Sequence, residues 1–499
     1  MGLKSLLISP FAKKIVANLR RQSDRAIDDQ WLTLNMLVSK AKNTKFGRDH
    51  HFDKIQGYVD FKKNVPIRDY ESFAPYIDLI KEAKPDILWP GIPLFFAKTS
   101  GTTSGTKYIP LSKESTPHHV DSARNSLFTY MVESGNHRFF DGKMLYLSGS
   151  PILQKTAGIN TGRLSGIVNH QIPGWVKGNK LPSHEVNCID AWEDKVSAIV
   201  RECAQLDVRV IGGIPPWVQM FYEELLAYTG KKQVIEVFPN LSLFVYGGVN
   251  FEPYRSQLEN LVGKSIDSIE TFPASEGFFA FQDKHPSEGL LLNTNAGMFF
   301  EFIPLTEIHS ENPPRLSLAE VETGINYALI VTSNAGLWAY NIGDTVEFTS
   351  LRPPRLKVTG RIKHFISAFG EHVIGKEVDE AMMQTSSTLG FQVIEFTVAP
   401  QVNPAEGLPY HEWFIELTGF DGDIKLIEEK LDVAMQEQNI YYRDLIEGKI
   451  LRPVKVTLLK PHAFRDYMQS IGKLGGQNKV PRLSNDRILA DALQPYHRQ

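Results

Sequence analysis

Nine residues from Thr99 to Lys107, reading T-S-G-T-T-S-G-T-K, combine the groups that suit a polyphosphate. Glycine lets the backbone curl and approach a ligand closely, and successive N–H groups in such a curl bind anions. Hydroxyl side chains alternate with the glycines, and Lys107 adds a point positive charge. The candidate phosphate-binding residues are Ser100, Gly101, Thr102, Thr103, Ser104, Gly105 and Lys107.

This stretch has a plainer interpretation, a solvated Ser/Thr/Gly turn, which its composition alone favours. A Walker loop requires G-x-x-x-x-G-K-[ST], but Gly101 and Gly105 are one residue too close, and Thr106 separates Gly105 from Lys107. The Walker interpretation therefore fails. The stretch resembles the phosphate loop of adenylate-forming enzymes, T-S-G-T-T-G-x-P-K, with Ser104 in place of a glycine.

Two acidic residues are candidates for contacts with a nucleotide or its metal ion, and the first of them, Glu276, is not placed as a surface charge would be. Glu276 follows Ser275, between a run ending at Phe272 and an aromatic-rich predicted strand. It is either a structural carboxylate or a Mg²⁺ ligand, since hard cations take carboxylate oxygen beside nucleotide phosphates. Asp344 follows Gly343 in a predicted turn, where an ionised acid accepts hydrogen bonds from ribose hydroxyls. An ordinary β-turn aspartate is the alternative.

The elements that must position these residues alternate between strand and helix patterns. Strands are predicted at 143–148, 208–213 and 241–249, and helices at 113–134, 192–207 and 217–228. This alternation indicates an α/β core containing parallel sheet. Ligands in such sheets bind at the carboxyl ends of strands, where the phosphate-binding stretch and Gly247–Gly248 are both expected.

The last part of the chain has a different order of elements. Strands at 391–399 and 412–418, a helix at 423–438 and a strand at 454–459 predict a small α+β domain. A loop containing Pro353–Pro354 precedes it and indicates a domain junction.

Composition is ordinary for a globular chain of 499 residues, with 42% hydrophobic and 22% charged residues. The formal net charge of −3 gives no general attraction to nucleic acid or anionic membranes. No stretch approaches the ~20 apolar residues of a membrane span, and the segment Met1–Arg21 favours an amphipathic helix packed on the body. Cys188 and Cys203 have no zinc-type spacing, so a reducing, cytoplasmic compartment is the simplest expectation.

Four signals occur in one order along the chain. They are the phosphate-binding stretch, the strand ending in Gly247–Gly248, the pair Ser275–Glu276, and Y-x-x-G-D from Tyr340 followed by Gly360–Arg361. Together they resemble the adenylate-forming superfamily, and within it the auxin-responsive acyl-acid amido synthetases of the Gretchen Hagen type, including bacterial relatives. T-K-F-G-R-D-H-H-F with V-P-I-R-D-Y-E, and the late Q-N-K-V-P-R at 477–482, support this narrower resemblance.

The resemblance implies roles for individual residues toward ATP and Mg²⁺. Besides the phosphate-binding stretch, the implied nucleotide-binding residues are Gly247, Gly248, Phe272 against adenine, Ser275, Tyr340, Asp344 on the ribose, and Arg361. Glu276 is the implied metal ligand, and Lys479 is the implied catalytic lysine. A solvent-exposed tail lysine is the alternative for Lys479, and Lys473 is the substitute if the alignment is displaced. Asn341 replaces the family's arginine, so no role is carried over for that side chain.

The resemblance also implies an organisation and a reaction. The implied fold is a large α/β domain, residues 1–361, with parallel sheet and β-barrel-type parts, followed by a small mobile α+β lid, residues 362–499. The implied reaction adenylates a carboxylic acid with ATP and then transfers the acyl group to an amine, usually that of an amino acid. A thioester ligase with the same first step is the nearest alternative, and a nucleotide- or acyl-binding protein without turnover is the alternative from another class.

The sequence does not specify which acid and which amine are used. The residues that would select them are expected in irregular loops, around 158–175 and 214–217.

Overall fold

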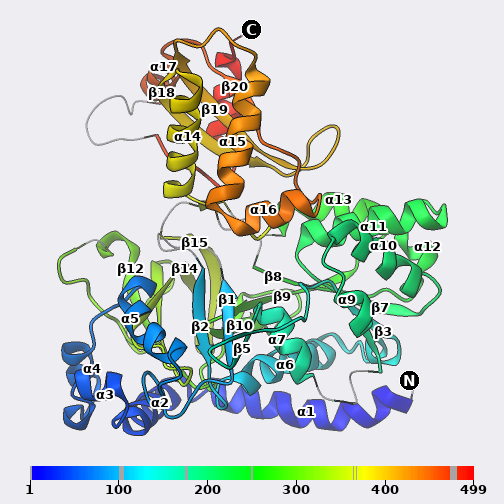
Figure 1. The fold of residues 1–499 in the computed structure, drawn as a ribbon. Helices are drawn as coiled ribbons and strands as arrows, with labels where there is room; N and C mark the ends of the chain where they lie inside the picture. The colour runs from blue at the N-terminus through cyan, green and yellow to red at the C-terminus, as the bar shows by residue number, and fades with distance from the viewer. Residues whose placement is uncertain are drawn as a thin grey trace. The chain divides into compact units, whose positions relative to one another are not determined.

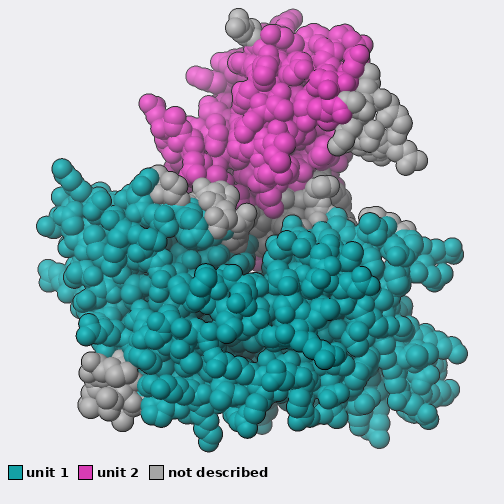
Figure 2. Space-filling view, turned by 180° about the vertical axis from the view of Figure 1, so that it is seen from behind, with its two compact units in different colours: residues 1–99, 107–190, 194–362 teal, residues 100–106, 191–193, 363–499 magenta. Residues whose placement is uncertain are grey.

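The structure is a computed structural model that describes residues 3–99, 106–172, 174, 178–248, 251–308, 310–362, 365–366, 368–371, 373–471 and 480–498. The chain forms two compact units, drawn in different colours in Figure 2. Unit 1 comprises residues 1–99, 107–190 and 194–362, and unit 2 comprises residues 100–106, 191–193 and 363–499. The architecture is α/β with a separate C-terminal unit, as the sequence predicts.

The described residues of unit 1 form two sheets (Figure 1). The four-stranded sheet has the order β2 (Lys107–Leu111), β1 (Phe95–Thr99), β5 (Ile159–Gly162), β4 (Gln154–Thr156). The eleven-stranded sheet has the order β12 (Met298–Pro304), β13 (Asn326–Ser333), β14 (Tyr340–Leu351), β15 (Pro354–Arg361), β11 (Leu290–Leu292), β10 (Gly277–Gln282), β9 (Asp267–Ala274), β8 (Leu243–Gly247), β7 (Val208–Gly212), β3 (Lys143–Tyr146), β6 (Lys180–Leu181).

The larger sheet is antiparallel from β12 to the β10–β9 pair and parallel from β9 to β6. Strand β9 runs parallel to β8, β8 to β7, β7 to β3, and β3 to β6. Because parallel strands all end on the same side, the carboxyl ends of β9, β8, β7, β3 and β6 lie along one edge of the sheet. This edge is called the carboxyl edge below, and it is where ligands bind in sheets of this kind.

Helices connect and cover these strands. Among the described residues before 363, the α-helices are α1 (Leu3–Ser23), α2 (Ala26–Ala41), α3 (Lys45–Asp49), α4 (Tyr58–Asn64), α5 (Tyr70–Lys81), α6 (Thr116–Ser134), α7 (Leu164–Gln171), α9 (His184–Asn187), α10 (Trp192–Cys203), α11 (Pro215–Thr229), α12 (Val234–Val237) and α13 (Glu252–Val262). Helix α1 packs on α6 through Ala12 and Val16, which confirms the expected packed amphipathic helix. Within the described residues, no helix has the length and apolar character needed to span a membrane.

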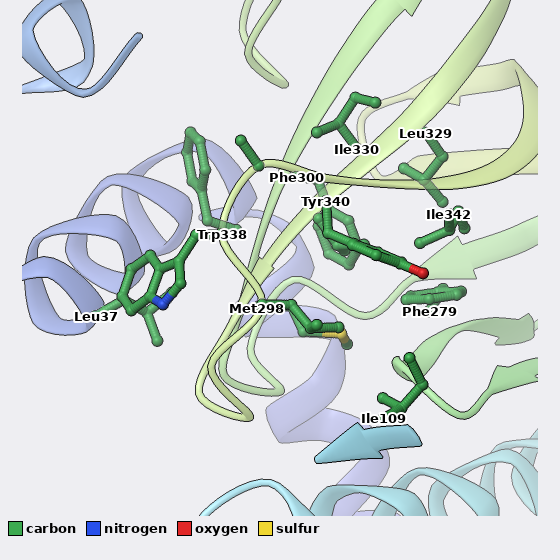
Figure 3. Close-up of a cluster of buried hydrophobic side chains, with 14 of the residues drawn as sticks. Leu37, Ile109, Phe279, Met298, Phe300, Leu329, Ile330, Trp338, Tyr340 and Ile342 are labelled. Carbon is green, nitrogen blue, oxygen red and sulfur yellow. The ribbon is translucent and has the colours of Figure 1, made fainter. Parts of the chain in front are cut away.

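The central strands are near-continuous apolar runs because both faces of the sheet are covered. Every residue of β10, G-F-F-A-F-Q, is buried. Figure 3 shows part of this core, with Trp338 beside Leu37 of α2, and Tyr340 near Phe279 and Met298. This hydrophobic core packs against the antiparallel strands of the larger sheet and also against β1 and β2 of the smaller one.

Buried polar side chains attach helices to the sheet at defined points. Gln30 of α2 donates from Nε2 to the carbonyls of Thr294 and Met298, at 3.0 and 2.8 Å, and its Oε1 accepts the Phe300 N–H at 2.8 Å. Buried polar groups are tolerated when they are paired in this way. Gln30 thus fixes α2 on β12.

A buried ion pair holds a loop on the same strand. Arg315 donates from Nε and Nη2 to the Glu301 carboxylate, at 2.8 Å each, and from Nη1 to the Val65 carbonyl at 2.6 Å. The Tyr58 hydroxyl donates to Glu301 at 3.0 Å. Glu301 is fully buried, so these partners replace the water that would otherwise surround its carboxylate.

Unit 2 packs helices against a sheet with the order β18 (Gln392–Gln401), β19 (Tyr410–Thr418), β20 (Lys455–Leu458). The strand, strand, helix, strand order predicted from the sequence is confirmed. The remaining elements are β16 (Phe365–Ile366), β17 (Val373–Ile374), α14 (Gly375–Leu389), α15 (Ile424–Gln438), α16 (Ile440–Glu447), α17 (Ala463–Ser470) and α18 (Ile488–Leu493). Helices α14 and α15 pack together (Figure 1).

Replacement of Arg315 tests the buried ion pair. We expect Arg315→Met to lower the free energy of unfolding of unit 1 by about 3–5 kcal/mol, because Glu301 is left buried and unpaired. Urea denaturation followed by tryptophan fluorescence measures this loss. The double variant Arg315→Met, Glu301→Met should recover much of it, and a loss under about 1 kcal/mol in the single variant would contradict the assignment.

Candidate active site

The carboxyl ends of β8 and β9 are in backbone contact. Gly247 ends β8 and pairs with Thr271 of β9. A Cβ atom built on Gly247 would lie 2.2 Å from the Thr271 carbonyl oxygen, so no other residue fits without moving a strand. Gly248 follows with a φ of +76°, in the left-handed region that favours glycine. Because neither glycine carries a side chain, a ligand beyond this edge can approach the backbone of Gly247 and Gly248 closely.

The pair Ser275–Glu276 forms the turn between β9 and β10. Ala274 pairs with Gly277, and the two residues between them are half-buried. Strand β9 continues beyond the apolar run that ends at Phe272, because Pro273 pairs with Phe278. The turn therefore consists of Ser275 and Glu276 themselves.

Phe272 precedes this turn within β9. Its side chain is only 7% exposed and meets the Phe279 ring edge to face, with centroids 5.1 Å apart. The ring is thus held by the core, and its predicted contact with adenine stays a prediction.

Three predicted residues from separate elements converge on one another. Lys107, at the start of β2, donates from Nζ to the Tyr340 hydroxyl at the start of β14, at 3.5 Å. Burial, followed by the negative charge of Glu276, raises the pKa of Tyr340 well above its usual value. Glu276 is therefore near enough for its charge to act on Tyr340. The structure therefore places the Lys107 ammonium on the Tyr340 hydroxyl, and the charge of Glu276 acts on the same phenol.

Asp344 lies within β14 rather than in a turn, which corrects the sequence prediction. Ala328 of β13 pairs with Thr345, and Ile330 pairs with Asn341, so β14 carries extra residues in a β-bulge at this point. Gly343 has a φ of +86°. Bulges re-aim side chains and are frequent beside active sites. The side chain of Asp344 is 7% exposed.

The bulge is held by the residue that replaces the family's arginine. Asn341 accepts the Gly343 N–H through Oδ1 at 2.9 Å. On the other side, Asp344 pairs with Arg361 of β15, and the Ile362 N–H donates to the Gly343 carbonyl at 2.8 Å. The backbone pairing of β14 with β15 thus places Arg361 beside Asp344.

Sequence reasoning missed the segment from Arg68 to Tyr70. The Arg68 N–H donates to the Ala339 carbonyl, and the Asn341 N–H donates to the Arg68 carbonyl, so this segment flanks Tyr340 on both sides. The Tyr70 hydroxyl accepts the Tyr108 N–H at 2.8 Å, next to Lys107. V-P-I-R-D-Y-E carries no local signal for this long-range pairing.

Several predicted residues lie outside the described residues: Ser100, Gly101, Thr102, Thr103, Ser104, Gly105 and Lys479. The side chain of Arg361 is also not described. Their predicted roles are therefore not tested. Among the residues that the structure describes, no group of three His, Cys, Asp or Glu side chains is arranged to hold a metal ion.

The fold is that of the adenylate-forming ligases. A solved acyl acid amido synthetase, AtGH3.15 in complex with 2,4-DB, is similar with a TM-score of 0.63 and 18% identity, over 98% of this chain and 96% of that one. A solved 2-hydroxyisobutyryl-CoA ligase is similar with a TM-score of 0.52 and 13% identity, over 97% and 92% of the two chains.

Three family descriptions match successive parts of the chain: the GH3 family N-terminal domain at 15–172, the central domain at 291–361 and the C-terminal domain at 376–488. The chain belongs to the GH3 family. This confirms the family resemblance read from the sequence.

Proteins of similar sequence include plant synthetases. A jasmonoyl-L-amino acid synthetase of Oryza sativa subsp. japonica is 22% identical over 86% of this chain and 88% of its own length. An indole-3-acetic acid-amido synthetase of Arabidopsis thaliana, GH3.15, is 22% identical over 91% and 90% of the two lengths. The match to another of its synthetases, GH3.3, is 27% identical but spans only 44% of that protein.

Replacement of Gly247 tests the close approach of β8 to β9. We expect Gly247→Ala to cost about 1–3 kcal/mol of stability, because its Cβ would overlap a backbone oxygen and separate the strand ends. Hydrogen exchange should accelerate at amides 246–248 and 271. Gly57→Ala is the matched control, since nothing lies within 4 Å of its Cβ position. Unchanged exchange in Gly247→Ala would contradict the predicted overlap.

Proposed function

We propose that the chain is an ATP-dependent acyl-acid amido synthetase. It adenylates a carboxylic acid and then transfers the acyl group to an amine, which we propose is that of an amino acid. The observation that carries this proposal is the convergence of Lys107 and Glu276 on Tyr340, beside the carboxyl edge of the parallel strands. Membership of the GH3 family supports the same reaction.

The reaction has two displacement steps. A carboxylate oxygen of the acid bonds to the α-phosphorus of ATP, and the bond from that phosphorus to the bridging oxygen breaks, releasing pyrophosphate. The amine nitrogen then bonds to the acyl carbon, the carbon–oxygen bond to AMP breaks, and the amine loses a proton. Catalysis of such steps is mostly positioning and electrostatic stabilisation of charge on phosphate oxygens.

Separate groups of residues serve separate parts of ATP in this proposal. The phosphates are assigned to 100–105 and Lys107, adenine to Phe272, and the ribose to Asp344 with Tyr340 alongside. The nucleotide reaches the backbone of the carboxyl edge at Gly247, Gly248 and Ser275. Arg361, in β15, supports the bulge that holds Asp344. An ionised aspartate suits ribose because it accepts from both hydroxyls.

Glu276 is the proposed Mg²⁺ ligand. Magnesium sites in nucleotide-using enzymes take one or two carboxylates, with phosphate oxygens and water completing the shell. One carboxylate in a turn, whose charge acts on the same tyrosine that Lys107 contacts, therefore fits such a site without a cluster of protein ligands. When bound, Mg²⁺ would neutralise charge on the phosphate oxygens.

The two parts of the chain have different roles in this proposal. Residues 1–361 bind ATP and the acid, and residues 362–499 act as a mobile domain that supplies Lys479 to the adenylation step. The ammonium of Lys479 would balance charge that accumulates at the α-phosphate. Cys188 and Cys203 are both free thiols, which supports a reducing, cytoplasmic compartment.

Thioester formation is the alternative with a specific observation in its favour, because the same fold is present in a CoA ligase. Incubation with ATP, Mg²⁺ and a panel of carboxylic acids, with either amino acids or coenzyme A, separates the two. Mass spectrometry should detect an amide together with AMP. A thioester product would favour the alternative, and ATP binding with neither product nor pyrophosphate would indicate a binding protein.

Replacement of Glu276 tests its proposed role at the metal. We expect Glu276→Gln to fold normally and to reduce Mg²⁺-dependent pyrophosphate release at least ~10²-fold, the scale of losing one electrostatic group in a preorganised site. A coupled pyrophosphate assay across a Mg²⁺ titration measures this. Circular dichroism checks that the variant folds, and near-normal release by folded Glu276→Gln would make this carboxylate structural.

Replacement of Asp344 tests the ribose contact. We expect Asp344→Ala to raise the KM for ATP with a modest fall in kcat, because a ribose contact is present in ground and transition states alike. Isothermal titration calorimetry with ATP should show weaker binding. If the affinity for ATP is unchanged, Asp344 serves only the bulge of β14.

A further inference from the structure

Lys195 of α10 is a buried cation that the proposed chemistry does not use. Its side chain is 2% exposed. Its ammonium donates to the Ser148 carbonyl at 3.0 Å and to the Asn187 carbonyl at 2.7 Å. One side chain therefore joins α10, the end of α9 and the loop that follows β3.

A second buried polar group approaches the same loop. Asn187 is fully buried, and its Nδ2 lies 3.5 Å from the Ser148 hydroxyl oxygen. The Oδ1 of Asn187 has no hydrogen-bond partner among the described residues. Lys195 and Asn187 thus both act on Ser148, one at its backbone and one at its side chain.

Ser148 occupies a particular place on the carboxyl edge. Strand β3 runs parallel to β7, and β7 runs parallel to β8, whose end carries Gly247. Between them β7 ends at Gly212, and the Tyr146 ring of β3 packs against this glycine, 2.5 Å from where a Cβ would lie. The edge therefore continues from the proposed nucleotide region past β7 to Ser148.

We infer that Lys195 is a positioning residue that fixes the loop at Ser148 as the wall of the carboxylic acid subsite. This inference rests on the proposed function, since that function puts an acid next to ATP on the carboxyl edge. The acid must reach the α-phosphate with its carboxylate, so its remaining atoms extend along the edge. Because Lys195 holds this wall and does not touch ATP, a change at Lys195 alters the fit of the acid and leaves ATP binding unaltered.

The charge environment of Lys195 gives the inference a pH signature. Burial is the main cause that lowers the pKa of Lys195 to about 8, with Arg163 and Lys180 acting in the same direction and Cys188 and Asp190 opposing them. Below that pH the ammonium makes charge-assisted hydrogen bonds, and above it the neutral amine makes weaker ones. The grip on Ser148 should loosen as pH rises through this value.

Steady-state pyrophosphate release measures the KM for the acid and for ATP separately. We expect Lys195→Met to raise the KM for the acid at least ~10-fold, the scale of losing hydrogen bonds from a charged donor, and to change the KM for ATP less than ~2-fold. Gln30→Met is the matched control, because it also removes a buried side chain that holds two carbonyls, away from the carboxyl edge. It should lower the melting temperature with both KM values unchanged.

A pH series gives a readout that does not depend on the stability of Lys195→Met. In the wild-type protein the KM for the acid should rise between pH 7 and 9, and Lys195→Arg, which stays charged, should lose this rise. Asp190→Asn, an exposed change, should move the rise to lower pH because it removes an acid that favours the ammonium.

The outcomes separate the inference from the proposed function. Suppose that the wild-type protein releases pyrophosphate in an acid-dependent way. If Lys195→Met then changes both KM values equally, or changes neither, the inference is overturned and the proposed function stands. A pH-dependent KM that is unaltered in Lys195→Arg and Asp190→Asn also overturns it. No acid-dependent release with any acid in the wild-type protein overturns the proposed function, and the inference with it.

Discussion

Parallel pairing of β9, β8, β7 and β3 is the constraint on which the rest of the site depends. It places the carboxyl ends of these strands on one edge, and the backbone contact between Gly247 and Thr271 leaves room for no side chain between the ends of β8 and β9. The hairpin turn after β9 then holds Glu276, whose charge acts on Tyr340 at the start of β14, and a bulge in β14 holds Asp344. Chemistry-bearing residues that are far apart in the sequence thereby become neighbours.

The polar residues near this edge are held by partners from other elements. Tyr340 is flanked by the backbone of Arg68 and receives a hydrogen bond from Lys107, while Lys195 fixes the loop after β3. Each of these contacts joins segments that no local pattern connects. Such preorganisation is what a reaction needs when positioning and electrostatics supply most of its acceleration.

Much of the fold was predictable from the sequence, and less of the site's geometry was. Apolar periodicity and double glycines identify the strands and the edge, because they are local properties. The bulge at Asp344 depends on register with β13 and β15, and the turn at Ser275 depends on β9 continuing through Pro273; neither register is a local property. Lys195 reads as a surface charge on an amphipathic helix, and only the packing of α9 and β3 around it makes it a buried anchor.

Acid-dependent exchange of labelled pyrophosphate into ATP is the most direct measurement of whether this edge activates carboxylic acids. It needs no amine and reports the adenylation step alone. Across a panel of carboxylic acids, we expect exchange that requires both Mg²⁺ and a particular class of acid, and that is present without any amine or coenzyme A. Absence of exchange with every acid, or exchange that is independent of the acid, would contradict an adenylating site at the carboxyl ends of β8 and β9.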